Sequence, residues 1–348
     1  MFPEMGTKKV CVLSAIILHV STLLERKIKM NEIVVAGAGV FGTSVAERLA
    51  WNRNNHVVLH TIELDVMEDI NTNHQNTKYF PTKFLNPGIT ATDDDSVFRN
   101  ADAVLLVLPS SVIVPFSERI KKEAKNNPLI VNLAKGMSDS GAFITEDIPF
   151  ERRASMKGPS FAIETMNGFP TSFTFGGKKE DYDYFSSVVL PKTGFTLDWT
   201  EDVRSVELCS ILKNMYAIAI GLVSGKYGSP NVDFLVYTKA VREMRKLLDI
   251  YGCSPETIFC YCGLGDLGLT ALNDLSRNRT FGMLIGKGFL FNDEKNAATV
   301  IEGRRTIKLI RDKIKNLRRE NEFPIVENLY KLLYENGKIN QYFMAVLK

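Results

Sequence analysis

The stretch that most constrains the fold of this chain is Gly37-Ala-Gly39-Val-Phe-Gly42, which directly follows the apolar run Glu32–Ala36. A helix-compatible segment comes next, and His56–Leu59 then forms a second apolar run. Many glycine-rich loops match this glycine pattern by chance, but between a strand and a helix it has a defined use. The first glycine permits a tight turn, the second lets a pyrophosphate approach the backbone, and the third allows close helix–strand packing. The pattern therefore predicts a dinucleotide-binding unit.

Further apolar runs at Ala103–Leu108 and Leu129–Leu133 are continuous, as expected of parallel strands that are covered on both faces. Helical patterns separate these runs, and Ser172–Phe175 is another candidate strand. Helical periodicity dominates the second part of the chain, and 348 residues are enough for two domains. We therefore predict an α/β fold, with a Rossmann-type doubly wound sheet domain over residues 30–199 and a mainly α-helical substrate and catalytic domain over residues 200–348.

Charge and composition exclude several classes of function. The net charge of +3 is too small to indicate binding to nucleic acid or to an acidic membrane surface. The five cysteines and four histidines show no metal-ligand spacing, so we predict no metal site. Free thiols in a reducing compartment are the favoured interpretation, which predicts a cytoplasmic protein.

The amino terminus has an apolar run, Val10–Leu24, between basic residues. This run is too short for a membrane span, which needs about 20 residues, and no Ala-x-Ala cleavage site follows it. Met30 directly precedes the first predicted strand. We therefore interpret residues 1–29 as an upstream extension, with an export signal as the alternative.

Glu63 follows the second predicted strand, at the position that usually selects between NAD and NADP. An acidic side chain there binds the ribose 2′-hydroxyl, whereas a basic one accepts the 2′-phosphate. The sequence has no arginine beside Glu63, so it favours NAD over NADP. The alternative is that Glu63 merely starts the next helix, where acidic residues are common.

Lys213 lies in the middle of a long, nearly apolar segment, and together with Glu207 it argues against a membrane span. Helical spacing places small or polar residues on the same stripe as this lysine: Ser210, Asn214, Ala217 and Gly221. We predict that Lys213 points inward, with room for a ligand beside it. Burial disfavours the charged form, so such a lysine can exchange protons near neutral pH. The alternative is that its side chain reaches the surface.

Lys135 comes immediately after the strand Leu129–Leu133. Ligands of open α/β sheets bind beyond the carboxyl ends of the strands, so we expect Lys135 to face the cleft, although such a lysine is more often a solvated loop charge. Residues 263–282 combine glycines with a carboxylate, hydroxyls and a guanidinium: Asp266, Thr270, Ser276, Arg277 and Asn278. This mixture suits a hydroxylated, phosphate-bearing ligand. A glycine-rich turn before an exposed basic helix is the alternative.

Taken together, these blocks resemble the NAD(P)-dependent glycerol-3-phosphate dehydrogenases of bacterial type. The matching segments occur in the family's order from Met30 onward: GAGVFGTSVA (37–46), NLAKG (132–136), KGPSFAIE (157–164), VELCSILKNMYAIAIG (206–221), GLGDLGLT (263–270), SRNRTFG (276–282), IEG (301–303) and FPIVENLY (323–330). Two departures stand out. Bacterial members often have arginine where this chain has Ile62-Glu63, and the family's Thr-Arg-Gly appears as Thr238-Lys239-Ala240.

The resemblance implies interconversion of dihydroxyacetone phosphate and sn-glycerol 3-phosphate with NAD or NADP, which feeds phospholipid synthesis. Lys213 matches the family's proton donor and acceptor, and Lys135 and Asp266 complete the implied catalytic set. The implied substrate-binding set is Lys135, Gly158, Ser160, Lys213, Asp266, Thr270, Ser276, Arg277 and Asn278. The predicted cofactor-binding set combines the turn residues and Glu63, argued above from the strand–turn–helix pattern, with residues that the resemblance implies: Gly37, Gly39, Val40, Phe41, Gly42, Glu63, Lys135, Ala162, Arg277, Val300 and Glu302.

Two other functions remain open at this point. A 3-hydroxyacid or 6-phosphogluconate dehydrogenase would share the dinucleotide domain and an inward lysine, but the SRNRTFG block favours the glycerol-phosphate type. A non-catalytic dinucleotide sensor would not need Lys213 or Asp266. The sequence also leaves the oligomeric state open, with a homodimer as one option.

Overall fold

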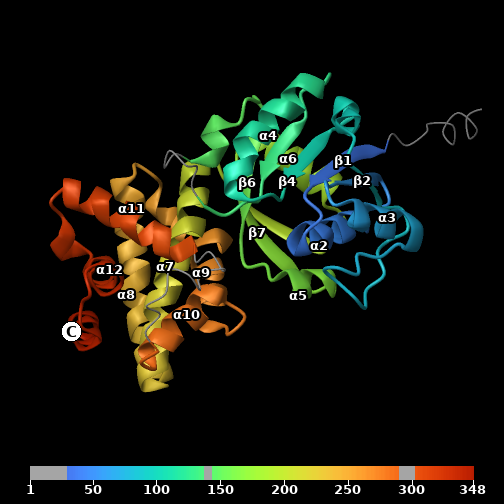
Figure 1. Ribbon diagram of the computed structural model, residues 1–348. Coiled ribbons are helices and arrows are strands. Elements are labelled where there is room, and N and C mark those ends of the chain that lie inside the picture. Colours follow the sequence, from blue (N-terminus) through green and yellow to red (C-terminus); the bar gives the residue numbers. More distant parts are fainter. Residues whose placement is uncertain (1–29, 137–142, 290–301) are drawn as a thin grey trace, which may run out of the picture.

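The computed structural model describes residues 30–136, 143–289 and 302–348, which form a sheet-containing unit beside a helical unit (Figure 1). The predicted extension over residues 1–29 and the predicted cofactor residue Val300 lie outside the described residues. Strand β8 (Phe195–Thr200) is followed at once by helix α7 (Val203–Tyr227), which is the connection between the two units. The division between domains at residue 199 or 200 stays a prediction.

Within the described residues, eight strands form one sheet in the order β3-β2-β1-β4-β5-β6-β7-β8. Neighbouring strands are parallel except for the pair of β6 and β7, so the predicted α/β class is confirmed. The other strands are β1 (Asn31–Ala36), β2 (Asn55–His60), β3 (Thr90–Thr92), β4 (Ala103–Leu106), β5 (Leu129–Asn132), β6 (Arg153–Lys157) and β7 (Thr171–Gly176).

The five predicted strands are confirmed as β1, β2, β4, β5 and β7, whereas β3, β6 and β8 were missed. The recognised strands are mostly buried, and β4 and β5 are buried along their whole length. Continuous burial requires the continuous apolar runs that made them visible in the sequence. Strand β3 is only three residues long, and β6 begins and ends with a basic residue. Most of β8 is half-buried, so its sequence is mixed.

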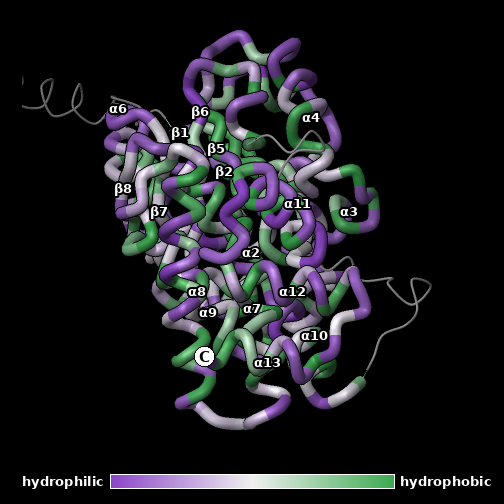
Figure 2. Tube along the Cα trace, turned by 90° about the vertical axis from the view of Figure 1, so that its left-hand side faces the viewer, coloured by the Kyte–Doolittle hydropathy of each residue, from purple (hydrophilic) through white to green (hydrophobic). Residues whose placement is uncertain are grey.

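The described part of the sheet-containing unit has five α-helices: α2 (Val40–Leu49), α3 (Leu64–Asn73), α4 (Ser110–Glu123), α5 (Ala162–Met166) and α6 (Lys179–Tyr184). They cover the two faces of the sheet, which explains why its central strands carry apolar residues throughout. Figure 2 shows this distribution, with hydrophobic colour concentrated in the strands and hydrophilic colour mostly at the periphery. Helix α2 starts directly after Gly39, where the phosphate-binding turn was predicted.

The helical unit packs around α7, with α8 (Pro230–Ile250), α9 (Asp266–Leu272), α10 (Arg277–Gly286), α11 (Glu302–Asn316), α12 (Pro324–Tyr334) and α13 (Ile339–Leu347). The Asp202 carboxylate caps the start of α7 by accepting from the backbone N–H of Ser205 at 3.0 Å. Gly228, with φ of 56°, ends the helix. Among the described helices, α7 alone is long and apolar enough to cross a membrane, and its apolar window is wholly buried in the protein. It is a core helix, as its charged residues indicated.

The glycines of α7 and α10 bring these two helices into backbone contact. A Cβ on Gly221 would lie 2.2 Å from the carbonyl oxygen of Arg279, and a Cβ on Gly282 would lie 2.2 Å from that of Ile218. At Gly221 the stripe therefore faces α10, while the predicted room for a ligand beside Lys213 itself stays a prediction. Helix α10 fills that part of the stripe, because two helices can approach this closely only where side chains are absent.

Candidate active site

The glycine-rich turn lies at the carboxyl ends of β1 and β4. Gly37 has φ of 108°, and a Cβ there would lie 2.3 Å from the carbonyl oxygen of Val107. A Cβ on Gly42 would lie 1.8 Å from the carbonyl oxygen of Gly37, so the helix and the turn touch directly. Gly39 differs from both, because a Cβ at this position would have no neighbour within 4 Å among the described residues. The turn thus has two glycines required by packing and one that faces open space.

The start of α2 provides the remaining features of a phosphate cradle. No side chain of residues 30–136, 143–289 or 302–348 caps this helix at Gly39, so N–H groups of its first turn are available to a ligand. Val40 is exposed and Phe41 is half-buried beside the turn. The open cradle at Gly39 and the uncapped N–H groups fit the pyrophosphate of NAD or NADP.

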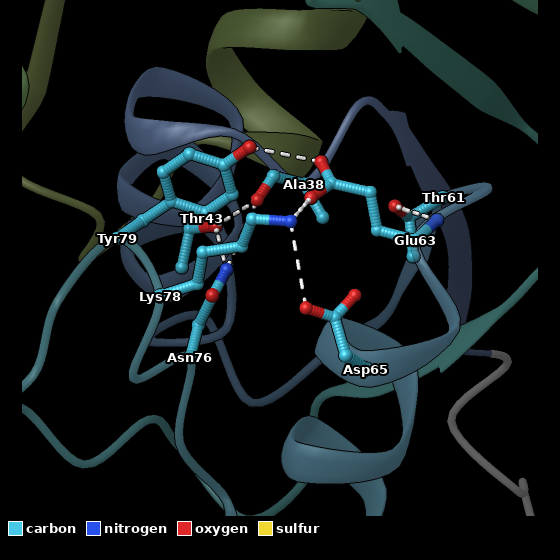
Figure 3. A network of polar contacts seen from close by, with 8 residues as sticks. All are labelled: Ala38, Thr43, Thr61, Glu63, Asp65, Asn76, Lys78 and Tyr79. Atoms are coloured by element: carbon cyan, nitrogen blue, oxygen red, sulfur yellow. Dashed lines mark hydrogen bonds and ion pairs between the residues drawn. The ribbon is translucent and has the colours of Figure 1, made fainter.

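Glu63 lies beyond the end of β2, next to this turn (Figure 3). Its carboxylate accepts a hydrogen bond from the hydroxyl of Tyr79 at 2.9 Å and forms an ion pair with Lys78. The same lysine lies 3.4 Å from the Asp65 carboxylate. The edge of the sheet where a ribose 2′-group is expected therefore carries two carboxylates and one ammonium group.

Lys213 and Asp266 form an ion pair, and each side chain is only 2% exposed. Lys213 comes from the middle of α7 and Asp266 from the first turn of α9. Burial lowers the pKa of Lys213 below its ordinary value, Asp266 opposes that shift, and the nearby Lys135 reinforces it. The prediction that Lys213 faces inward is confirmed, and the alternative of a surface lysine is wrong.

Backbone hydrogen bonds hold the segment before Asp266 against the sheet. The N–H of Cys262 donates to the hydroxyl of Thr174 on β7 at 2.9 Å, and the N–H of Tyr261 donates to Asp198 on β8 at 3.1 Å. Among the described residues, one oxygen of Asp266, Oδ2, is buried without a hydrogen-bond partner, and so is the hydroxyl of Ser210 one turn before Lys213. Unsatisfied polar atoms beside a buried ion pair are suited to a polar ligand.

Lys135 follows β5 at the same edge of the sheet as the glycine-rich turn. The N–H of Leu133 donates to the carbonyl of Leu106 at 3.0 Å, and that of Val107 donates to Ala36 at 2.9 Å. These bonds align the ends of β5, β4 and β1. Lys135 is half-buried and close enough to Lys213 to affect its pKa. The predicted orientation toward the cleft is consistent with this placement.

A network of buried polar side chains includes Asn132, which lies three residues before Lys135. The carboxylate of Glu207 accepts hydrogen bonds from Asn132, at 2.7 Å, and from the hydroxyls of Thr145 and Ser155. The ammonium of Lys157 donates to the carbonyl of Asn132 at 2.6 Å. Burial lowers the pKa of Lys157 to about 8, while Glu207 opposes the shift. This network joins α7 to the ends of β5 and β6, so it fixes the Lys135 loop relative to the helix that carries Lys213.

The loop after β6 and the start of α5 hold three more predicted residues. A Cβ on Gly158 would lie 2.3 Å from the carbonyl oxygen of Ser172, so the loop crosses β7 closely. The hydroxyl of Ser160 donates to the carbonyl of Gly158 at 3.1 Å. Ala162 is half-buried at the first position of α5. Their roles in ligand binding stay predictions.

The residues predicted to hold a phosphate lie at the start of α10 and in α9. The Ser276 hydroxyl caps α10 by accepting from the backbone N–H of Arg279 at 3.3 Å, and Arg277 is exposed beside it. The side chain of Asn278 accepts a hydrogen bond from the N–H of Gly303 at 3.3 Å, which brings α11 to this helix end.

In α9, the Thr270 hydroxyl lies 3.4 Å from the carboxylate of Asp266. Glu302 begins α11, but its side chain lies outside the described part of the chain.

Comparison with known proteins decides between the remaining functions. Residues 32–183 match a family described as NAD-dependent glycerol-3-phosphate dehydrogenase N-terminus, and residues 202–344 match its C-terminus. The chain belongs to the NAD-dependent glycerol-3-phosphate dehydrogenase family. It is therefore an oxidoreductase that uses NAD or NADP, and the hydroxyacid and sensor alternatives are disfavoured.

Relatives named glycerol-3-phosphate dehydrogenase (NAD(P)+) match nearly the whole chain. The relative from Methanothermobacter thermautotrophicus is 32% identical over 316 residues, covering 89% of this chain and 95% of that protein. The relative from Enterococcus faecalis is 29% identical and covers 89% and 94%, respectively. A solved glycerol-3-phosphate dehydrogenase from Coxiella burnetii superposes with a TM-score of 0.77 at 27% identity, covering 92% of this chain and 99% of that one.

Three charged residues with defined contacts around the candidate site are not singled out by the sequence: Lys78, Lys157 and Glu207. Lys78 lies fifteen residues beyond Glu63, in a segment without a motif. Lys157 was within the quoted KGPSFAIE block but has no neighbouring apolar run to mark it as buried. In the sequence, Glu207 indicates only that its apolar segment is not a membrane span. A buried charge in an apolar helix was the available signal, because such charges persist only with partners.

Proposed function

We propose that the chain interconverts dihydroxyacetone phosphate and sn-glycerol 3-phosphate, with Lys213 as the proton donor and acceptor. The observation that carries this proposal is the buried ion pair of Lys213 and Asp266 beside Lys135, at the sheet edge that also bears the dinucleotide turn. The relatives are named glycerol-3-phosphate dehydrogenase (NAD(P)+), and these names support the proposed substrate pair.

The residues divide the chemistry between them. NADH or NADPH, when bound, supplies the hydride that reduces the ketone carbon. The ketone oxygen then takes a proton from the ammonium of Lys213, which becomes a neutral amine. Asp266 holds this ammonium in place, and the positive charge of Lys135 stabilises negative charge on the oxygen. In the oxidative direction, the neutral amine of Lys213 accepts the hydroxyl proton.

The phosphate group would be held at the start of α10. Arg277 is exposed there, and a planar guanidinium can donate two parallel hydrogen bonds to phosphate oxygens. Ser276 and Asn278 flank it, and Thr270 lies beside Asp266. We assign the substrate hydroxyl to Oδ2 of Asp266, because that buried oxygen has no hydrogen-bond partner in the part of the chain that the structure describes.

We also propose that NAD is preferred to NADP, because Glu63 and Asp65 place two negative charges where a 2′-phosphate would bind.

Operation in the cytoplasm, with the product entering phospholipid synthesis, fits the free thiols of Cys209 and Cys262, which lie against each other in the core. Cell fractionation would check the location. A homodimer stays a prediction, which sedimentation would test.

The deciding experiment uses the purified chain and measures initial rates with NADH and with NADPH. Dihydroxyacetone phosphate is compared with 3-oxoacids, and the oxidised cofactors are tested with glycerol 3-phosphate, 3-hydroxyacids and 6-phosphogluconate. We expect turnover only with the triose phosphate pair and a higher kcat/KM with NADH. Turnover confined to the acids would overturn the assignment of the substrate.

A further inference from the structure

Lys78 occupies a defined place beside the predicted ribose site, although the sequence between β2 and β3 gave no reason to single it out. Its ammonium forms an ion pair with Glu63 and lies 3.4 Å from Asp65 (Figure 3). Both carboxylates belong to the start of α3, immediately beyond the strand whose end selects the cofactor. The hydrogen bond with Glu63 raises the pKa of Lys78, so the side chain is charged at neutral pH.

The turn that carries Lys78 is fixed to the dinucleotide turn itself. The amide of Asn76 is fully buried and donates to the carbonyl of Ala38, between the first two glycines, at 3.0 Å and to the hydroxyl of Thr43 at 2.8 Å. The N–H of Tyr79 donates in turn to the carbonyl of Asn76 at 3.1 Å. These bonds position Lys78 relative to the phosphate cradle, so it is not a lysine on an unconstrained loop.

The partners of Lys78 leave it available to a ligand. Its side chain is 47% exposed, and that of Asp65 is 69% exposed. The Tyr79 hydroxyl also donates to Glu63, so this carboxylate keeps a hydrogen-bond partner if Lys78 moves away. An exposed ion pair contributes little free energy, so an incoming dianion can replace the carboxylates at little cost.

We propose that Lys78 is a specificity-determining residue for the cofactor, whose ammonium binds the 2′-phosphate of NADP. When NAD is bound, the Glu63 carboxylate accepts hydrogen bonds from the ribose hydroxyls. When NADP is bound, the same carboxylate competes with the 2′-phosphate for the ammonium of Lys78. The balance between Lys78 and the two carboxylates then sets the ratio of the two affinities. A chain without an arginine beside Glu63 can thereby use both cofactors.

This inference rests on the proposed use of NAD or NADP at this turn, and its test does not require catalysis. Isothermal titration calorimetry on the full chain compares adenosine 2′,5′-bisphosphate, which carries the 2′-phosphate, with 5′-AMP, which lacks it. We expect Lys78→Met to weaken binding of the bisphosphate about tenfold or more and binding of 5′-AMP by less than about threefold. The bisphosphate effect should shrink as salt is raised, because Lys78 is exposed.

Three variants keep the test decisive. Lys78→Arg retains the charge and should bind the bisphosphate within about threefold of the unmodified chain. Lys83→Met removes an equal charge from the same loop and should change neither affinity. Glu63→Gln should strengthen bisphosphate binding several-fold, because it removes the competing carboxylate. Far-ultraviolet circular dichroism confirms that each variant is folded.

Equal weakening of both ligands by Lys78→Met would overturn the proposal, since it would mean that Lys78 only supports the turn. No weakening of either ligand would also overturn it. The expected binding pattern in a protein that fails to reduce dihydroxyacetone phosphate would leave the role of Lys78 intact and overturn the proposed function instead.

Discussion

Lys213 and Asp266 form a buried ion pair between the middle of α7 and the first turn of α9. Removing either partner leaves a charge with little water around it, which is costly. We expect Asp266→Asn to lower kcat/KM for reduction of dihydroxyacetone phosphate roughly 10- to 100-fold, because the ammonium loses its orienting partner. Steady-state kinetics on this variant, with its fold checked by circular dichroism, provide the measurement. Activity within twofold of the unmodified chain would remove Asp266 from the mechanism.

The pH dependence of the reaction should report the lowered pKa of Lys213. Burial lowers that pKa, so the protonated form needed for reduction is lost at a lower pH than for an exposed lysine. We therefore expect kcat/KM for reduction to fall as pH rises through the lowered pKa of Lys213. The rate of glycerol 3-phosphate oxidation should rise over the same pH interval. A reduction rate that is flat up to pH 10 would contradict this assignment.

Two variants should move that pH profile in opposite directions. Asp266 raises the pKa of Lys213 against the effect of burial, so Asp266→Asn should shift the fall in the reduction rate to lower pH. Lys135 lowers the same pKa, so Lys135→Met should shift the fall to higher pH. Rate profiles of both variants, each normalised to its own maximum, measure the shifts. Shifts of the same sign would show that another group titrates.

The network around Glu207 should contribute to stability as well as to the position of Lys135. Glu207→Ala removes the acceptor that lies 2.7 Å from the Asn132 amide and the carboxylate to which the buried Thr145 hydroxyl donates. It also removes the carboxylate that most strongly opposes the lowering of the Lys157 pKa. We expect the free energy of unfolding in urea to fall by about 3–5 kcal/mol. The control is Glu146→Ala, because Glu146 forms an exposed pair with Arg204; its loss should cost less than about 1 kcal/mol.

Alanine substitutions at Gly39 and Gly221 should distinguish a glycine needed for cofactor binding from a glycine needed for helix packing. A Cβ at Gly39 meets nothing within 4 Å in the described parts of the chain, so Gly39→Ala should keep the free energy of unfolding within about 1 kcal/mol. It should weaken NADH binding at least tenfold. A Cβ at Gly221 would meet the Arg279 carbonyl, so Gly221→Ala should destabilise the chain by about 1–3 kcal/mol. Calorimetric binding and urea unfolding of both variants test this. A Gly39→Ala chain with unchanged NADH affinity would contradict the proposed cradle.

The sequence predicted those parts of the fold that depend on local pattern. Buried parallel strands such as β4 and β5 need continuous apolar runs, and the turn at Gly37 needs glycine, so both could be recognised without a structure. The inward orientation of Lys213 followed from an apolar helix that carries a charge. The partner Asp266 could be placed near it only through the resemblance, since the two residues are on different helices.

Other features depend on contacts that no local pattern encodes. The sequence places Gly221 on the same stripe as Lys213 but does not show that α10 packs directly against it, because the distance between two helices is a tertiary property. Lys78 reaches Glu63 only because Asn76 anchors its turn to Ala38. Strand β8 is half-buried, so its composition resembled that of a loop.

The central claim, that Lys213 provides the proton, is tested most directly by Lys213→Met. Initial rates of dihydroxyacetone phosphate reduction and the calorimetric affinity for NADH are measured together, with Lys226→Met, an exposed lysine on the same helix, as the control. We predict that kcat falls about 10²- to 10⁴-fold in Lys213→Met while NADH affinity stays within about threefold, and that Lys226→Met changes neither. A Lys213→Met enzyme that retains more than a tenth of the original kcat would contradict the account.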